Sequence, residues 1–310
     1  MLFRIAAVAH NTYRENVRAR LLHGLFGLAV ATVGYTLVVS AYAFRDTVRV
    51  IGDVGGATVS LYGIIVAVVL GATALYRELE LKTAFPILAR PVARWEYLVG
   101  KFAGTWLTLL VFVLLDAGLL LLAVSSVGGA NPTRVASFGL GVVGVASFVA
   151  WRLPRVRSWI PFGIAVAWVS IGWWTAAVVP DERRVLLFCA VLALFEIAIV
   201  IAIAHVFSAF SSPFLTAMLT LGVVVVGRSA DVLARLPARV FGAALSAFGK
   251  SIAAAVPNLM VYVPPRSLMT GEMPDIDIRM YVVHAMTMAI GWVVLLLVIA
   301  SLIFRRRDFT

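Results

Sequence analysis

Charge is scarce in this sequence. Only 13% of its 310 residues are charged and 62% are hydrophobic, whereas a soluble domain carries roughly 25% charged residues. The apolar residues recur in runs of about 18 residues or more, the length at which a helix crosses a bilayer. Since backbone groups inside lipid are satisfied only within helices or closed barrels, we predict an all-α fold, that of a polytopic helical membrane protein.

Cysteine is nearly absent and acidic residues are few. Cys189 is the single cysteine, so one chain can form neither a disulfide framework nor a thiolate metal cluster. The 26 lysines and arginines outnumber the 15 acidic residues, which gives a net charge of +11. In a soluble protein this excess would indicate a nucleic-acid partner. Between membrane spans it indicates positive cytosolic loops and contacts with anionic membrane lipids, so we expect lipids and no nucleic acid as partners.

A signal peptide with a cleavage site is also missing from the start of the sequence. Residues 1–20 are amphipathic: Phe3, Ile5 and Val8 supply an apolar side, and Arg14 and other arginines supply the polar one. We expect this segment to form a helix that lies on the membrane surface.

The apolar runs predict six to eight transmembrane helices within a single transmembrane domain covering residues 1–310. The runs are 21–44, 55–76, 103–126, 135–151, 158–179, 185–208, 212–227 and 281–304. The run 212–227 is short for a span, and 45–54 is expected to be a loop. Residues 130–182 form an extra helix pair in this interpretation, and without that pair six spans remain.

The positive-inside rule orients these spans with both termini in the cytosol. Arg152, Arg155 and Arg157 lie between two apolar runs, where a cytosolic turn is expected, and therefore favour eight spans. Residues 228–280 then form an external segment. Apolar residues recur there at helical spacing, which predicts an amphipathic helix interrupted near Pro237.

The segment 77–101 differs from the runs on either side of it. It carries Arg77, Glu78 and Glu80 within one turn and is broken by Pro86 and Pro91. A segment with so much charge is costly to bury in lipid, and two prolines predict short helices with a bend. We interpret it as a cytosolic coupling helix that a soluble partner could grip.

Several motifs in and around this segment resemble a known family. They are Asn11-Thr-Tyr-Arg-Glu15, Glu78-Leu-Glu-Leu-Lys-Thr83, Leu88-Ala-Arg-Pro-Val-Ala-Arg94, Leu98-Val-Gly-Lys101 and Ser208-Ala-Phe-Ser-Ser-Pro213. Together they resemble the permease subunits of ABC-2 type transporters, and especially the NosY-like permeases. The resemblance covers 1–125 and 185–310 and is weak over 130–182.

The resemblance implies a permease that moves or extracts a substrate with ATP hydrolysed by a separate subunit. ATP and magnesium would then bind the partner, and this chain would hold no cofactor and have no catalytic residue. It also implies a second permease copy, as a homodimer or with a paralogue, in the bacterial cytoplasmic (inner) membrane. The residues expected to couple to the ATP-binding subunit are Glu78, Glu80, Thr83, Phe85, Ile87, Pro91 and Arg94.

An ATPase within this chain is rejected. The stretch from Ala244 to Ser251 loosely resembles a phosphate-binding loop, and Val111 to Asp116 resembles a Walker B strand. A phosphate-binding loop follows a strand and begins with glycine, but this one lacks the first glycine, is predicted to be helical and lies outside the cell. No set of catalytic or metal-ligating residues appears at a recognisable spacing.

Asp116 and Glu196 each fall near the middle of a predicted span. An ionisable group at that depth is a functional candidate by default, and the structural alternative is a carboxyl that holds two helices together. If functional, the pair would favour a secondary transporter with an ion or proton path; a non-transporting membrane scaffold is the third alternative. The glycines within 100–104 and 139–144 are interpreted as helix-packing contacts.

Overall fold

The computed structural model describes residues 1–18, 20–43, 46–80, 93–273 and 277–306. Within these ranges the chain forms helices joined by short turns and contains no strand. The all-α, polytopic fold class predicted from the apolar runs is therefore confirmed.

The helices have these bounds, in chain order: α1 Leu2–Val17, α2 Arg20–Ser40, α3 Thr47–Glu80, α5 Arg94–Val127, α6 Pro132–Arg152, η1 Pro154–Trp159, α7 Ile160–Thr175, η2 Ala176–Val178, α8 Pro180–Ser208, α9 Pro213–Arg228, α10 Ala230–Ala234, α11 Ala238–Phe241, α12 Ala243–Ala255, η3 Leu259–Tyr262, α13 Arg266–Thr270 and α14 Ile278–Arg306. Seven helical segments of the described chain are long and apolar enough to span a membrane, within the predicted six to eight. The short run expected at 212–227 is α9, which has 16 residues and is not among the seven.

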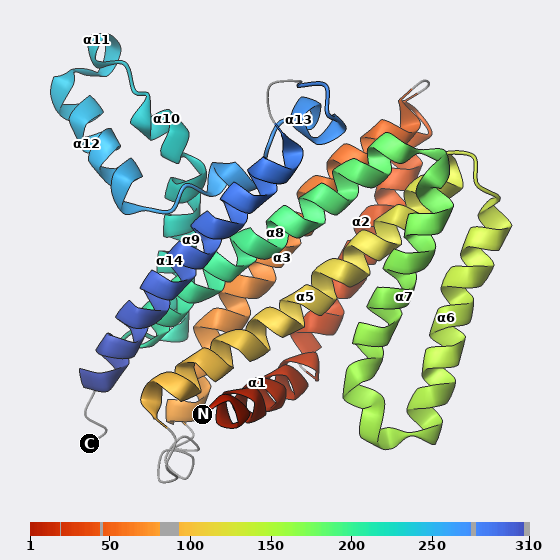
Figure 1. Ribbon diagram of the computed structural model, residues 1–310, viewed down its shortest axis with the longest axis horizontal. Helices are drawn as coiled ribbons and strands as arrows, with labels where there is room; N and C mark the ends of the chain where they lie inside the picture. Colours follow the sequence, from red (N-terminus) through yellow and green to blue (C-terminus); the bar gives the residue numbers. More distant parts are fainter. Residues whose placement is uncertain (19, 44–45, 81–92, 274–276, 307–310) are drawn as a thin grey trace.

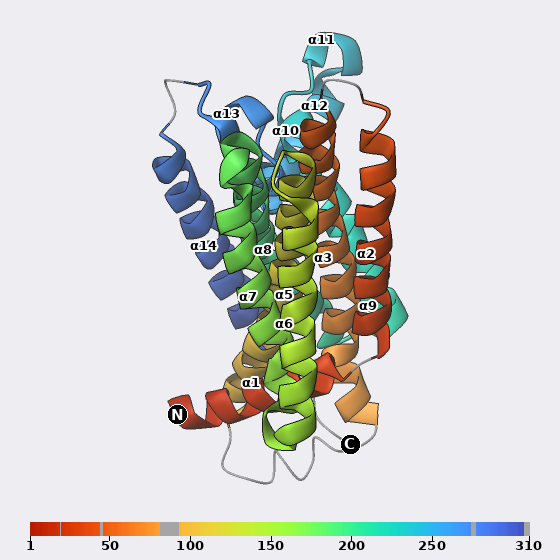
Figure 2. The same cartoon turned by 90° about the vertical axis from the view of Figure 1, so that its right-hand side faces the viewer.

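The long helices run side by side in one bundle (Figures 1 and 2). α3, α5 and α8 form its centre and contribute most of the buried apolar residues. α2 and α14 flank them, and α6 and α7 form a hairpin on one side. α1 crosses one end of the bundle, and α10 to α13 gather at the other. We call these two ends of the bundle the α1 end and the α13 end.

α1 lies directly against the start of α5, where two glycines allow close approach. A Cβ at Gly104 would come within 2.5 Å of the Ala9 carbonyl oxygen, and one at Gly100 within 2.7 Å of Val8 Cβ. Ion pairs of 3.9 Å between Arg4 and Glu96 and between Lys101 and Glu15 flank this contact. The interpretation of the glycines in 100–104 as packing positions agrees with this geometry, and α1 is held by α5 as well as by any membrane surface.

The prediction of a loop at 45–54 is wrong, because α3 begins at Thr47. Arg49 and Asp53 lie one turn apart on this helix and their side chains approach to 3.7 Å, the spacing that pairs opposite charges on a helix. α3 then continues without a break to Glu80 and has 34 residues. The first residues of the coupling segment 77–101 thus extend α3, while residues 81–92 lie outside the described ranges.

The segment 228–280 is also less regular than predicted. In place of one helix with a single interruption it contains α10, α11 and α12 as separate short helices. The break near Pro237 is present, and a second one follows at Gly242, whose φ of +84° is accessible mainly to glycine. The three pieces form a cap at the α13 end of the bundle (Figure 1).

The hairpin of α6 and α7 occupies the 130–182 region. Asn131 caps α6 by accepting hydrogen bonds from the Thr133 and Arg134 backbone N–H groups, 3.1 and 3.3 Å long. The glycines within 139–144 were interpreted as helix-packing contacts, and only one of them lies at such a contact. Gly139 meets Leu122 of α5, but a Cβ at Gly141 or Gly144 would have no atom within 4 Å, so these two glycines are not packing contacts.

Candidate functional site

Glu196 is the centre of a buried polar cluster between α3, α8 and the end of α9. Its side chain is fully buried. Arg228 donates to both carboxylate oxygens, at 2.9 Å from Nε and 3.0 Å from Nη2. Ser60 of α3 also donates to Glu196, at 2.8 Å, and its hydroxyl oxygen accepts from Arg228 at 2.6 Å. A charged pair is therefore held inside the bundle with its hydrogen bonds satisfied, as buried charge requires.

The position of this cluster follows from the short length of α9. At about 1.5 Å per residue, the 16 residues of α9 rise about 24 Å from the α1 end. Glu196 lies 12 residues before the last residue of α8, or about 18 Å along that helix. α9 thus stops inside the bundle close to the level of Glu196. Arg228 is its last residue, and a cation is also favoured at a helix C-terminus.

A second set of ion pairs lies nearer the α13 end. Arg266, the first residue of α13, donates through separate nitrogens to Asp53 of α3 and to Glu182 of α8. Burial disfavours the charged form of Arg266, but the hydrogen bonds that it donates to these two carboxylates outweigh this effect and raise its pKa. Gly52 makes room for this arrangement, because a Cβ there would lie 2.1 Å from Glu182 Oε2.

A cavity of about 330 Å³ lies between the two sets. Charged and polar residues from both sets of ion pairs line it, and Tyr262 of η3 forms part of its wall. The Tyr262 hydroxyl donates to the Ala285 carbonyl of α14, 3.1 Å away, and burial raises its pKa, so it stays a donor. The lining residues are Arg49, Gly52, Asp53, Gly56, Ala57, Ser60, Val185, Cys189, Arg228, Tyr262, Val263, Pro264, Arg266 and Met269. The arrangement suits a polar group.

The structure does not bring the two mid-span carboxyls together. Asp116 of α5 is 1% exposed, and neither of its oxygens has a hydrogen-bond partner in the described part of the chain. Glu196, by contrast, accepts three side-chain hydrogen bonds. The two mid-span candidates are therefore in different environments, and only Glu196 is bonded to residues that line the cavity, Ser60 and Arg228.

The residues predicted to couple to an ATP-binding subunit are only partly described. Glu78 and Glu80 lie in the last turn of α3. Thr83, Phe85, Ile87 and Pro91 lie outside the described residues. Arg94 begins α5, and its Nη1 donates to the Phe304 and Arg305 carbonyl oxygens at the end of α14, at 3.3 and 2.8 Å. Arg94 therefore also joins the end of the coupling segment to the last helix.

Three residues of the cavity were not predicted from the sequence. Arg228 and Arg266 fall in the segment interpreted as an external connection, where arginines are expected to be solvated, and Ser60 is one hydroxyl in an apolar run. The only signal was the carboxyl of Glu196 in mid-span, which needs a donor. Among the described residues, no group of three or more His, Cys, Asp or Glu side chains could hold a metal ion.

Comparison with known families decides the class of this protein. Residues 6–309 match the family model described as ABC-2 family transporter protein. The chain belongs to this family. Comparison with curated proteins found no match.

Membership in the ABC-2 family agrees with the helical bundle. Proteins of this family are membrane components of transporters that work with a separate ATP-binding subunit. The match also covers α6 and α7, so the hairpin at 130–182, where the motifs gave weak resemblance, lies within the family's domain.

Proposed function

We propose that this ABC-2 family protein is the permease subunit of an ATP-driven transporter, of the NosY-like type, that moves or extracts a substrate. A separate ATP-binding subunit binds ATP and magnesium, and a second permease copy, identical or paralogous, completes the membrane unit. The protein lies in the bacterial inner membrane with both termini, and hence the α1 end, in the cytosol. The α13 end and its cavity face outward.

The observation that supports coupling is the continuity of α3. This helix has 34 residues and is about 51 Å long. One end carries Glu78 and Glu80 of the coupling segment, and the other carries Asp53 and Ser60 of the cavity. A rigid helix transmits an axial shift or a tilt over its full length, so movement of the coupling segment shifts Asp53 and Ser60 relative to the carboxylates of α8.

The coupling segment offers the chemistry of an interface with a soluble subunit. Phe85 and Ile87 serve as apolar anchors, because a few buried anchors carry most of the energy of such interfaces. Glu78 and Glu80 face basic groups of the partner and set the register. The bend of the segment is expected at Pro86 and Pro91, and Thr83 precedes it in sequence. Closure of the ATP-binding subunits then moves this segment and, through α3, the cavity.

Arg94 extends the same mechanism to α14. Its guanidinium holds the carbonyl oxygens of Phe304 and Arg305, so a displacement at the start of α5 also moves the end of the last helix. α14 in turn receives the Tyr262 hydrogen bond at the Ala285 carbonyl. The coupling segment is thus connected to the part of the cavity wall formed by α3 and, through α14, to Tyr262.

A secondary transporter is the alternative based on Asp116 and Glu196. In such a protein a mid-span carboxylate exchanges an ion or a proton during the cycle. Glu196 is neutralised by Arg228 at 2.9 Å, which leaves no net charge for a coupling ion. Asp116 is then the remaining candidate for ion or proton exchange, and the variant Asp116→Leu tests this role.

The test is co-purification of the ATP-binding subunit with this chain, together with the ATPase rate of the complex. Phe85→Ala should release the partner. The double variant Glu78→Lys with Glu80→Lys should weaken docking in a salt-dependent way, or leave hydrolysis uncoupled from transport. Phe241→Ala is the matched control, since Phe241 is half-exposed at the opposite end of the bundle. Unchanged co-purification and ATPase rate in all variants would refute the coupling role of this segment.

A further inference from the structure

A second cavity, at the α1 end, is lined by positive charge. Its volume is about 550 Å³. Arg14 and Arg18 border it from the end of α1, and Arg155 and Arg157 border it from the turn between α6 and α7. The remaining lining residues are Val17, His23, Pro154, Ser158 and Pro161. Four guanidinium groups from two distant parts of the chain thus surround one space, called here the basic pocket.

In the part of the chain that the structure describes, no carboxylate forms an ion pair with these four arginines. None of the residues lining the basic pocket is acidic. The acidic residue closest to them in sequence, Glu15, pairs with Lys101. The arginines of the outward cavity, by contrast, are each matched by a carboxylate. The basic pocket therefore has the charge to hold an anion from outside this chain.

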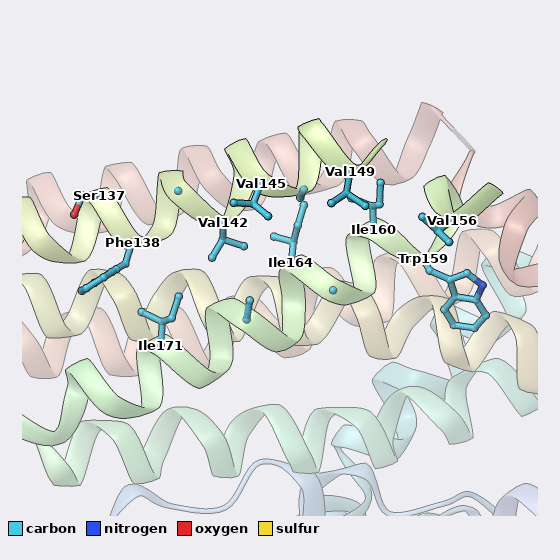
Figure 3. A pocket seen from close by; sticks show the side chains of 14 residues that line it. Ser137, Phe138, Val142, Val145, Val149, Val156, Trp159, Ile160, Ile164 and Ile171 are labelled. Carbon is cyan, nitrogen blue, oxygen red and sulfur yellow. The ribbon is translucent and has the colours of Figure 1, made fainter. Parts of the chain in front are cut away.

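An apolar groove runs along the neighbouring hairpin (Figure 3). It lies between α6 and α7 and has a volume of about 620 Å³. Ser137 is the only residue with a polar side chain near its far end, and Trp159 lies at the end next to the turn. The other lining residues are Phe138, Gly141, Val142, Val145, Ala146, Val149, Val156, Ile160, Gly163, Ile164, Ala167 and Ile171. The groove extends from the turn toward the α13 end, along the direction of the spans.

One turn of the chain borders both spaces. Within η1, Arg155 and Arg157 line the basic pocket, while Val156 between them lines the groove. Trp159 of the groove stacks on His10 of α1, with ring centroids 5.6 Å apart. Tyr13 holds the same turn by donating to the Ser158 carbonyl oxygen at 3.0 Å. Burial raises the pKa of Tyr13 to about 12, so this donor keeps its proton at neutral pH.

We propose that the basic pocket and the groove form one binding site for an anionic phospholipid. The phosphate lies among the four arginines, and one acyl chain extends along the groove between α6 and α7. Arginine binds phosphate through charge-assisted, often bidentate hydrogen bonds. The proposal rests on the orientation given under Proposed function, which puts the pocket at the cytosolic leaflet, where anionic lipids are enriched.

The position of the groove favours a lipid over a protein helix as its occupant. The hairpin lies at the side of the bundle (Figure 1), and α6 exposes large apolar residues such as Leu140, Val145 and Phe148. In a membrane these side chains face acyl chains. The cationic end and the apolar length of the site match the two ends of an anionic phospholipid, whereas a lipid with no net charge brings a cation with its phosphate and leaves more of the arginines' charge uncompensated.

The charge is tested with the purified full-length protein in neutral detergent. Phosphatidylglycerol or phosphatidylcholine is titrated, and bound lipid is counted by native mass spectrometry. Wild type should retain phosphatidylglycerol selectively. Arg155→Gln with Arg157→Gln should weaken its binding about 30-fold, since each basic residue near an anionic headgroup contributes about 1 kcal/mol. The matched control is Arg134→Gln with Arg152→Gln, which removes the same charge from positions outside the pocket and should leave binding unchanged.

The groove is tested with two glycines of α6. A Cβ at either Gly141 or Gly144 has open space around it, but only Gly141 lines the groove. Gly141→Leu should weaken phosphatidylglycerol binding at least about tenfold by excluding several methylene groups. Gly144→Leu, with the same change in size and helix propensity, should have no effect. Glycerol 1-phosphate, which has the headgroup chemistry without acyl chains, should not compete at millimolar concentration.

Three results would overturn the proposal. Equal loss of binding in the pocket variant and its charge-matched control would show that only net charge matters. Competition by glycerol 1-phosphate at the affinity of the lipid would identify a site for a soluble anion. A change of oligomeric state in Gly141→Leu with lipid binding intact would show that the groove holds a second copy of the chain.

Discussion

The pairing of Arg228 with Glu196 predicts an asymmetric response to mutation. Glu196 is fully buried, whereas the side chain of Arg228 is 34% exposed and reaches the cavity. Arg228→Met leaves a carboxylate inside the bundle with only the Ser60 hydroxyl as a donor. Glu196→Gln leaves an arginine that can still be solvated from the cavity. We therefore expect the arginine variant to lose much more stability than the glutamate variant.

The magnitudes follow from the same contacts. Breaking a buried ion pair so that one charge remains costs about 3–5 kcal/mol, which is expected for Arg228→Met. Glu196→Gln removes charge-assisted hydrogen bonds but keeps an acceptor for Ser60, so about 1–2 kcal/mol is expected. The double variant Glu196→Leu with Arg228→Met removes both charges and should be close to wild type, because replacing a whole buried pair is often neutral.

Thermal unfolding in a mild detergent measures these differences. With about 2 °C per kcal/mol for a chain of this size, Arg228→Met should lower Tm by about 6–10 °C and Glu196→Gln by about 2–4 °C. A double-mutant cycle made of Glu196→Leu, Arg228→Met and the two together should give a coupling energy of at least about 2 kcal/mol. Additive losses in the double variant would refute the reasoning, since they would show that the two side chains do not compensate each other.

Three further predictions concern other parts of the bundle. Asp116→Leu should raise Tm and leave transport unchanged, because the buried carboxyl has no partner among the described residues; lost transport in a stable protein would favour the ion-path alternative. A cysteine introduced as Pro154→Cys should react only from the cytosolic side, and labelling of intact cells by an impermeant reagent would contradict the topology. Gly104→Leu should lower stability by about 1–3 kcal/mol, since its side chain meets the Ala9 carbonyl, and wild-type Tm would refute tight packing of α1.

The helical class and most spans were predictable because long apolar runs leave few alternatives in a membrane. The errors lie where helices continue past such runs. Arg49 and Asp53 suggested a loop, yet they pair across one turn of α3 and project beyond the apolar part of the helix. Composition shows which residues avoid lipid, but it does not show whether the backbone there is still helical.

The candidate site was predictable only in part, for a related reason. Glu196 stood out as a carboxyl in an apolar run. Its partner Arg228 lies 32 residues away and was assigned to an external segment, because α9 was taken as a full crossing. Near the end of α9, Gly227 packs so closely on the segment after α12 that a Cβ there would lie 2.8 Å from the Pro257 carbonyl oxygen, a contact that spacing in the sequence does not reveal.

Arg228 and Arg266, two of the three arginines that line the cavity near the α13 end, have a common geometry that bears on mechanism. Arg266 contacts both Asp53 of α3 and Glu182 of α8, and Arg228 contacts both Ser60 of α3 and Glu196 of α8. Each arginine therefore bridges the same two helices, and each is supplied by the segment that follows α8. Movement of α3 against α8 must lengthen or exchange contacts at both levels.

Ion pairs of this kind are weak evidence for stability but can specify one arrangement among several. A charged bridge has few alternative partners in a low-dielectric interior, so it favours discrete positions of α3 over a continuous slide. ATP-driven movement of the coupling segment would then switch α3 between positions that keep or release the arginines. In this mechanism the double variant Glu196→Leu with Arg228→Met keeps its fold but loses the deeper bridge. It should hydrolyse ATP with its partner normally while transport falls, and full transport in that variant would show that the bridge only stabilises the bundle.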